Sequence, residues 1–272
     1  MCLILFAWRM HEKFPLILAA NRDEFYERPS APAAFWDDAP DILAGRDLKR
    51  GGTWLGITRT GRLAAVTNYR DPASLKQDAP SRGELVSDYL RGRENPETYL
   101  RRLEPRAARY NGFSLLTGNG SELVYFSNRG GVSRLAPGIH GMSNHLLDTP
   151  WPKVARGKQA LEALLLSKND PSPEALLALL ASRSRPPDES LPETGVGLEW
   201  ERVLSPLFIE SPTYGTRCST VLLIDGEGIV TFVERVFNGG SEPWLTSRFD
   251  FRMTGAKGDA KRTEGVLVNG RS

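Results

Sequence analysis

Two apolar runs lie close together near the amino terminus, at residues 3–8 and 15–20, with a short polar segment between them. Continuous apolar runs of this length are typical of strands that are buried on both faces. The short polar segment predicts that the runs pair as an antiparallel β-hairpin over residues 2–21. A hairpin brings its two ends together, so we expect Cys2 to lie in a cleft beside the polar residues 21–24.

Cys2 begins the first of these runs and follows the initiator Met1. Because the Cys side chain is small, we expect Met1 to be removed, which leaves Cys2 with a free α-amine beside its thiol. An amino-terminal amine titrates near ~7.7–8.0 and a free thiol near ~8.5, so the amine can take the thiol proton. Nucleophile and base would then come from one residue. The alternative interpretation is a small apolar residue at the start of a buried strand.

The rest of the chain alternates between apolar runs and amphipathic stretches that are separated by Gly, Asn and Pro. Residues 26–50 are rich in Pro, Ala and Asp and are expected to be irregular, and residues 183–198 are expected to form a loop. One further strand is expected to open with residues 51–56 and to end at Thr58. Others are expected at residues 63–68, 112–117, 123–128, 132–135, 219–224 and 229–236. Helices are expected after a Ser-x-x-Glu capping box at residues 81–84, from Asn95-Pro96, and at residues 152–166 and 172–180.

This order places strands before and after a group of helices, which indicates an α+β fold built in layers. A chain of 272 residues, 40% of them hydrophobic, is long enough for a large core. We expect residues 1–252 to form one domain. Residues 253–272 contain little apolar content, and we expect them to form a mobile tail.

Charge and cysteine content argue against several classes of function. The net charge is +2 with Lys and Arg scattered along the chain, which gives no case for nucleic acid binding. The apolar run before Arg9 is too short for a signal peptide or a membrane span, and two cysteines make no disulfide framework, so we expect a cytoplasmic protein. No spacing of Cys and His indicates a zinc site or covalently attached haem, and no glycine-rich loop indicates a nucleotide, so we expect no metal and no cofactor. Nothing in the pattern predicts the oligomeric state.

Four polar clusters lie at the ends of predicted strands or in loops, at residues 21–24, 67–70, 143–145 and 214–220. Their Asn residues are typical of turns, and Arg217 is compatible with an ordinary charge at the end of a strand. Polar clusters in these positions can also form a site where strand ends meet.

These clusters, with Cys2 and the Gly-Gly-Thr-Trp-Leu-Gly sequence at residues 51–56, resemble the NRDE family, whose animal members are called transport and Golgi organisation proteins. The further matching motifs are Asn-Arg-Asp-Glu at 21–24, Thr-Asn-Tyr-Arg at 67–70, Met-Ser-Asn at 142–144 and Gly-Thr-Arg-Cys-Ser-Thr at 215–220. The resemblance runs from residue 2 to about residue 237, most of the chain. The family is related to the N-terminal nucleophile hydrolases, which include penicillin V acylase and bile salt hydrolase. The resemblance therefore implies a four-layer αββα sandwich.

In the acylase branch of those hydrolases, the strand after the nucleophile ends in Arg-x-x-Asp followed by an aromatic residue. If Phe25 matches that aromatic residue, Asn21 takes the Arg position and Glu24 takes the Asp position. The Arg and Asp of the acylases position the nucleophile and its amine. This departure weighs against amidase activity unless Arg22 and Asp23 take over those roles through a local shift.

The resemblance implies a catalytic set of Cys2, Asn68, Asn144 and Arg217. Cys2 would attack a carbonyl, while Asn68 and Asn144 would donate N–H groups to the developing oxyanion. Arg217 or Arg22 would supply positive charge that stabilises the thiolate or an anionic substrate.

The substrate-binding set that the resemblance implies is Asn21, Arg22, Asp23 and Glu24, with Trp54 as a residue that could line an apolar pocket. Two functions stay open at this point. One is the hydrolysis of a non-peptide C–N amide bond in a small molecule. The other is a binding or carrier protein for haem or an acyl lipid such as acyl-coenzyme A on the same scaffold.

Overall fold

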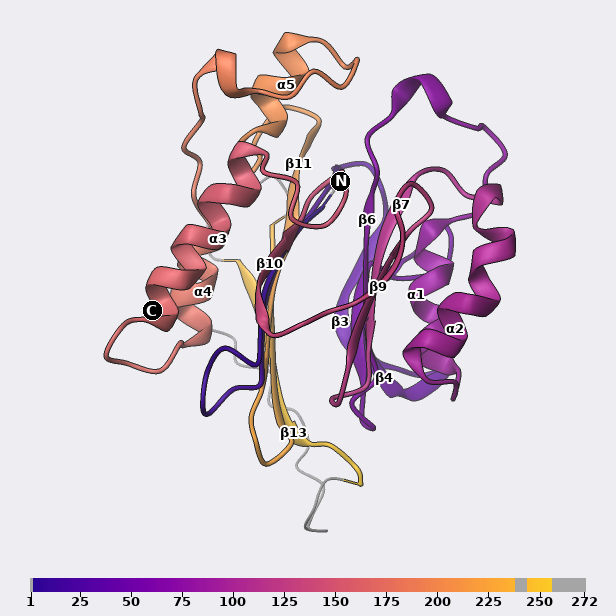
Figure 1. The fold of residues 1–272 in the computed structure, drawn as a ribbon, viewed down its shortest axis with the longest axis vertical. Helices are drawn as coiled ribbons and strands as arrows, with labels where there is room; N and C mark the ends of the chain where they lie inside the picture. Colours follow the sequence, from indigo (N-terminus) through magenta and orange to yellow (C-terminus); the bar gives the residue numbers. More distant parts are fainter. Residues whose placement is uncertain (1, 238–243, 256–272) are drawn as a thin grey trace.

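The computed structural model describes residues 2–237 and 244–255. Its strands form two antiparallel sheets that stack face to face, with helices on both outer faces (Figure 1). The predicted α+β sandwich of four layers, αββα, is confirmed. No helix in the described part of the chain is both long enough and apolar enough to cross a membrane.

The first sheet carries the amino-terminal hairpin at its centre. Its strands, in spatial order, are β10 (Gly138–Met142), β1 (Cys2–Trp8), β2 (Leu16–Phe25), β11 (Tyr214–Ile224), β12 (Ile229–Val236) and β13 (Leu245–Arg252). β1 and β2 pair antiparallel with Cys2 opposite Arg22 and Trp8 opposite Leu16, which confirms the predicted hairpin. The helices α3 (Pro152–Leu165) and α4 (Pro173–Leu180) cover its outer face (Figure 1). The short helices η3 (Asp188–Ser190) and α5 (Leu198–Leu204) follow in the chain.

The second sheet follows chain order from one edge to the other. Its strands are β3 (Ser30–Trp36), β4 (Ala39–Asp47), β5 (Leu55–Thr58), β6 (Leu63–Asn68), β7 (Phe113–Gly118), β8 (Leu123–Ser127) and β9 (Gly131–Arg134). The helices α1 (Arg82–Arg91) and α2 (Pro96–Leu103) cover its outer face (Figure 1), and the short helices η1 (Pro72–Ser74) and η2 (Glu104–Arg109) flank them in sequence.

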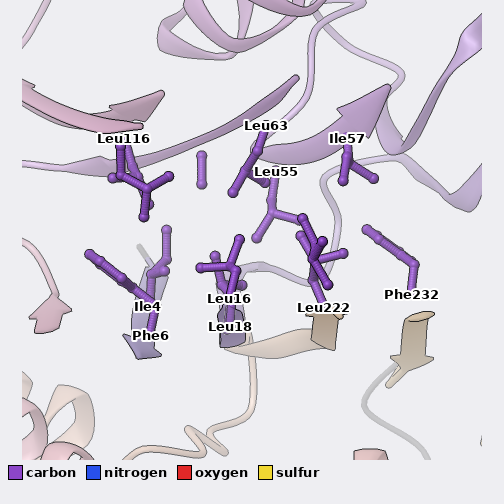
Figure 2. Close-up of a cluster of buried hydrophobic side chains, with 14 of the residues drawn as sticks. Ile4, Phe6, Leu16, Leu18, Leu55, Ile57, Leu63, Leu116, Leu222 and Phe232 are labelled. Carbon is purple, nitrogen blue, oxygen red and sulfur yellow. The ribbon is translucent and has the colours of Figure 1, made fainter. Parts of the chain in front are cut away.

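The main core lies between the two sheets. Because side chains of a strand alternate between its two faces, every second residue of each strand enters this layer. On β1 these are Ile4, Phe6 and Trp8, while Leu3 and Leu5 face the helices α3 and α4. Figure 2 shows the apolar side chains of both sheets pointing toward one another across the layer.

The prediction that residues 26–50 are irregular was wrong, because they form β3 and β4. β3 is an edge strand, where Pro32 removes no hydrogen bond that the sheet needs. Leu43 contributes to the core between the sheets, and Ile42 packs in the core beneath α1 and α2. Burial in the folded protein therefore determines this pair of strands more than local composition does.

Two further strands, β10 and β13, were not predicted, and both form edges of the first sheet. The predicted loop at 183–198 contains η3, and α5 begins at its last residue. Of the predicted tail, residues 256–272 lie outside the described residues. Within the described part, the backbone N–H groups of Met253 and Thr254 donate to the carbonyls of Gly228 and Arg59, each at 2.8 Å.

The helix starts at 81–84 and 95–96 were predicted correctly, but their capping interactions differ. The side chain of Asn95 accepts a hydrogen bond from the backbone N–H of Thr98 at 2.8 Å. Ser81 makes no such bond, and Glu84 instead accepts a hydrogen bond from the hydroxyl of Tyr110 at 2.5 Å. The predicted reciprocal capping box is therefore absent at the start of α1.

We predict that Asn95→Ala lowers the free energy of unfolding by about 1 kcal/mol, because it removes a side-chain cap. Ser81→Ala serves as the matched control and should change the stability by less than about 0.5 kcal/mol. Urea denaturation of both variants measures the difference. Equal losses in the two variants would contradict the assignment of the caps.

Candidate functional site

The alternation of side chains along β1 and β2 decides which polar residues face the space between the sheets. Cys2 and Arg22 lie directly opposite each other in the ladder, so their side chains share one face. On β2 this is the face of Leu18 and Ala20, which belong to the core between the sheets. Asn21 lies on the other face, toward α3 and α4.

A cavity of about 210 Å³ has Cys2 in its wall. The other lining residues come from the end of β2, the loop that precedes β5, the end of β6 and the start of α1. They include Arg22, Asp23, Trp54, Asn68 and Arg82. The cavity thus joins motifs that are distant in the sequence, and most of its lining side chains are polar or charged.

Cys2 is a partly exposed residue, and it is a free cysteine in the wall of this cavity. Burial raises the pKa of Cys2 above its ordinary value and the charge of Asp23 raises it further, while the charge of Arg22 lowers it. The charge of Arg22 thus acts on the thiol in the direction that the sequence predicts, but burial outweighs it. A base that takes the proton during the reaction would be needed for efficient attack.

Arg22 is 6% exposed, and its guanidinium carbon lies 4.3 Å from the centre of the Trp54 ring. Its Nη1 atom is buried and has no hydrogen-bond partner among the described residues. Trp54 is placed by Gly45, because a Cβ atom there would lie 2.3 Å from the indole. Trp54 thus packs against the core between the sheets and also stacks on the arginine beside Cys2.

Asp23 connects the cavity to the helix layer. Its Oδ1 atom accepts a hydrogen bond from the Thr216 hydroxyl at 2.7 Å, and its Oδ2 atom lies 3.9 Å from Nζ of Lys153 on α3. Burial raises the pKa of Asp23, and Lys153 opposes that shift. Burial lowers the pKa of Lys153, against the effect of Asp23. Lys153 was not predicted as a site residue, although its spacing from the buried Gly157 and Leu161 places it on the covered face of α3.

Asn21 does not reach the cavity. Its Nδ2 atom donates to the carbonyls of Leu180 and Leu207, at 3.0 and 2.8 Å, and its Oδ1 atom accepts from the Ser219 hydroxyl at 2.6 Å. The side chain is 1% exposed, so these contacts hold it between β11 and the end of α4. The first residue of the Asn-Arg-Asp-Glu motif is therefore placed as a structural residue.

Asn68 and Asn144 meet, but only Asn68 lines the cavity. The side chain of Asn68 makes no hydrogen bond to any described residue, so its amide is available to a ligand. Asn144 has a positive φ of 58°, a conformation that Asn tolerates better than most residues. Its Nδ2 atom donates to the Asn68 carbonyl at 3.4 Å, and its Oδ1 atom accepts from Arg70 at 3.2 Å. Asn144 therefore lies outside the cavity wall and holds the backbone of Asn68 through this hydrogen bond.

Glu24 and Arg217 differ in their position relative to the cavity. Glu24 lines the cavity and is 3.7 Å from Arg28, which also pairs with Asp47 at 2.6 Å. Arg217 is not part of the cavity wall. Its Nη1 atom donates to the carbonyls of Phe25 and Arg28, at 2.9 Å each, and so holds the turn between β2 and β3.

The Gly-Gly-Thr-Trp motif forms one wall of the cavity together with α1. A Cβ atom on Gly52 would lie 2.6 Å from the backbone carbon of Gly83, so only glycine permits this approach. The backbone N–H of Thr53 donates to the Gly83 carbonyl at 3.2 Å. No group of three or more His, Cys, Asp or Glu residues that could hold a metal ion occurs in the described ranges.

Comparison with known sequences shows that the chain belongs to one protein family. The family model described as Transport and Golgi organisation 2 matches residues 1–239. The chain is 39% identical to the Transport and Golgi organization protein 2 homolog of Bos taurus, over 93% of this chain and 99% of the relative. It is 31% identical to Transport and Golgi organization protein 2 of Drosophila melanogaster, over 88% of this chain and 93% of the relative.

Two solved structures share the fold at low sequence identity. The N-acylethanolamine-hydrolyzing acid amidase ortholog of Caenorhabditis elegans superposes with a TM-score of 0.50 at 10% identity, covering 82% of this chain and 92% of that chain. The C2A mutant of the conjugated bile acid hydrolase from Clostridium perfringens gives a TM-score of 0.52 at 8% identity and covers both chains completely. At these identities the comparison shows a common fold.

We predict that Asn21→Ala lowers the free energy of unfolding by roughly 2–4 kcal/mol, because it leaves two buried carbonyls and a hydroxyl without their partner. The alkylation rate of Cys2 in the folded variant should stay within about twofold of the wild type, since Asn21 faces away from the cavity. Chemical denaturation and peptide mass spectrometry measure the two effects. A stable variant with altered Cys2 reactivity would place Asn21 in the site instead.

We predict that iodoacetamide modifies Cys2 faster than Cys218, by roughly tenfold or more. Cys218 is 3% exposed, and burial raises its pKa well above 9.0. Because the pKa of Cys2 is also raised, its alkylation rate should still increase as the pH rises past 9. A rate that levels off near neutral pH would show that the thiolate is already formed there.

Proposed function

Because the chain belongs to the Transport and Golgi organisation 2 family and has the fold of the N-terminal nucleophile hydrolases, we propose that it is an N-terminal cysteine hydrolase. Its substrate would be a small molecule with a non-peptide C–N amide bond. The names of the two solved structures, an amidase and a hydrolase, support this class of reaction.

The observation that carries the proposal is the position of Cys2 at the start of a central strand, in the wall of a polar cavity. The same wall holds Asn68, an amide without a protein partner among the described residues, and Asp23, which connects to the buried Lys153. A nucleophile beside a hydrogen-bond donor and a charged pair is the arrangement that acyl transfer needs.

The proposed reaction begins after removal of Met1. The α-amine of Cys2 takes the thiol proton as sulfur attacks the carbonyl carbon, and the Asn68 amide donates a hydrogen bond to the oxyanion. The C–N bond breaks, and the proton passes from the α-amine to the leaving amine. Water then attacks the thioester, which releases the carboxylic acid and restores the thiol. Asp23 and Lys153 would orient the α-amine of Cys2 through their charges.

The cavity is smaller than the roughly 300–1,000 Å³ that encloses a whole small ligand. We therefore expect it to hold the reacting end of the substrate, with the remainder outside. Haem or an acyl lipid bound without turnover is the alternative function. It differs from the hydrolase in one clear respect, because ligand binding would then not depend on the sulfur of Cys2.

We predict that Cys2→Ala abolishes turnover of acyl amides while leaving the fold intact. Cys2→Ser should retain little activity, because a hydroxyl is far less acidic than a thiol. Asn68→Ala should lower kcat by about 10²–10³, the usual effect of one oxyanion donor. Asn169→Ala, which changes an exposed residue outside the cavity, is the matched control and should keep wild-type kcat.

The test is a panel of acyl amides assayed with each variant, beside titrations with haem and acyl-coenzyme A. Intact-mass measurement of each protein establishes whether Met1 has been removed. If a protein that starts at Cys2 turns over none of the amides, the hydrolase proposal fails. Tight binding of haem or acyl-coenzyme A that survives Cys2→Ala would then assign the carrier function.

A further inference from the structure

Some of the arginines in the cavity wall form ion pairs with carboxylates and others do not. Arg28 already engages the two carboxylates at the rim, with Asp47 at 2.6 Å and Glu24 at 3.7 Å. Asp23 accepts from Thr216 and lies near Lys153, on the helix side of the sheet. The three other arginines of the wall, Arg22, Arg50 and Arg82, form no ion pair with any carboxylate of the described residues.

Arg22 gives the strongest indication of a missing acceptor. It is 94% buried, by its exposed fraction of 6%, and its Nη1 atom has no hydrogen-bond partner among the residues that the structure describes. A buried donor without an acceptor costs roughly 1–3 kcal/mol, and more when the group is charged. Stacking on Trp54 fixes the plane of the guanidinium in the cavity wall. A planar fork held in this way suits a carboxylate or a phosphate.

Arg82 and the start of α1 add positive charge at the cavity beside Arg22. Arg82 is the first residue of the ten-residue helix α1, and residues 81–83 line the cavity. Ser81 provides no side-chain cap, so the positive end of the helix dipole is not satisfied by its own N-cap residue. Arg82 donates through Nη1 to the carbonyl of Gly112 at 3.0 Å, which anchors its side chain at the cavity. Arg50 is exposed on the loop that precedes the Trp54 motif. It is the third of the cavity arginines that form no ion pair among the described residues.

We propose that the cavity beside Cys2 binds an anionic group, a carboxylate or a phosphate, through Arg22 with Arg82 and Arg50. That this group belongs to the substrate rests on the proposed hydrolase function, whereas the anion site itself does not. A volume of about 210 Å³ accommodates such a group together with a few further atoms. The substrate class is thus an acyl amide with an anion close to the bond that Cys2 attacks.

Two alkylating reagents of almost the same size test the site. Iodoacetate carries a carboxylate and iodoacetamide is neutral, and both react with the thiolate, so the pKa of Cys2 cancels in the ratio of their rates. Peptide mass spectrometry gives the ratio at Cys2, which is divided by the ratio for free cysteine in the same buffer. We expect a normalised ratio of roughly ten, falling as salt is added. A ratio at or below one, as the rim carboxylates alone would produce, overturns the proposal.

Substitutions assign the effect to residues. Arg22→Gln should bring the normalised ratio close to one, Arg22→Lys should retain part of it, and Arg50→Gln should lower it about twofold. The control is Arg59→Gln, because Arg59 also stacks on an aromatic ring, 3.7 Å from the centre of Phe35, but does not line the cavity. Should Arg22→Gln fail to fold, Arg50→Gln and the Arg59→Gln control still decide whether the cavity arginines produce the ratio. An unchanged ratio in Arg50→Gln and Arg22→Lys contradicts the assignment.

Competition distinguishes the two kinds of anion. Inorganic phosphate and acetate are added separately to wild-type protein, and sodium chloride at equal ionic strength is the control. Slower iodoacetamide labelling of Cys2 with phosphate indicates a phosphate site, and slower labelling with acetate indicates a carboxylate site. Protection by neither beyond that of chloride overturns the anion site. These measurements need no turnover, so failure of the hydrolase proposal leaves them valid.

Discussion

The antiparallel register of β1, β2 and β11 is the constraint on which the rest of the site depends. It places Cys2 opposite Arg22 on one side of β2 and Cys218 opposite Arg22 on the other. A shift by one residue in either ladder would turn these side chains toward the helices. The register is held by the apolar residues of β1 and β2, which fill both neighbouring core layers. The packing that stabilises the two core layers therefore also places Cys2 at the cavity.

The same register keeps the two cysteines chemically separate. They lie two strands apart, which is about 9–10 Å between Cα atoms, beyond the roughly 7 Å that a disulfide spans. Burial and the neighbouring Glu234 raise the pKa of Cys218 instead, and the Oε1 atom of Glu234 accepts from the backbone N–H of Ala33 at 2.6 Å. Through this hydrogen bond, Glu234 on β12 links the first sheet to β3 of the second sheet. The layer between the sheets is thus apolar over most of its area and polar at the end that carries the site.

Much of the fold was predictable from the sequence, and the reasons are physical. The hairpin and the strands β6, β7 and β8 follow from apolar runs that the folded protein buries, and Asn95 acts as the predicted cap. Edge strands such as β3 and β13 have weak patterns because one side of their backbone has no partner strand. Within the site, the family resemblance identified the motif at residues 21–24 but did not show that alternation sends Asn21 and Arg22 to opposite faces. Lys153 was missed because its role appears only when α3 packs on the first sheet.

Burial of the thiol and the positive charge around it constrain how the nucleophile works. Burial raises the pKa of Cys2, and Arg22 is among the groups that lower it. An anion bound to Arg22 would cancel part of that lowering, so the thiol would become still harder to ionise once substrate is in place. For the proposed hydrolase, a thiolate formed before attack is therefore disfavoured. Transfer of the thiol proton to the α-amine during attack avoids this conflict, because the reactants are then neutral. The proposed recognition of an anion by Arg22 is thus compatible with the proposed activation by the amino terminus, whereas the same recognition combined with a preformed thiolate is not.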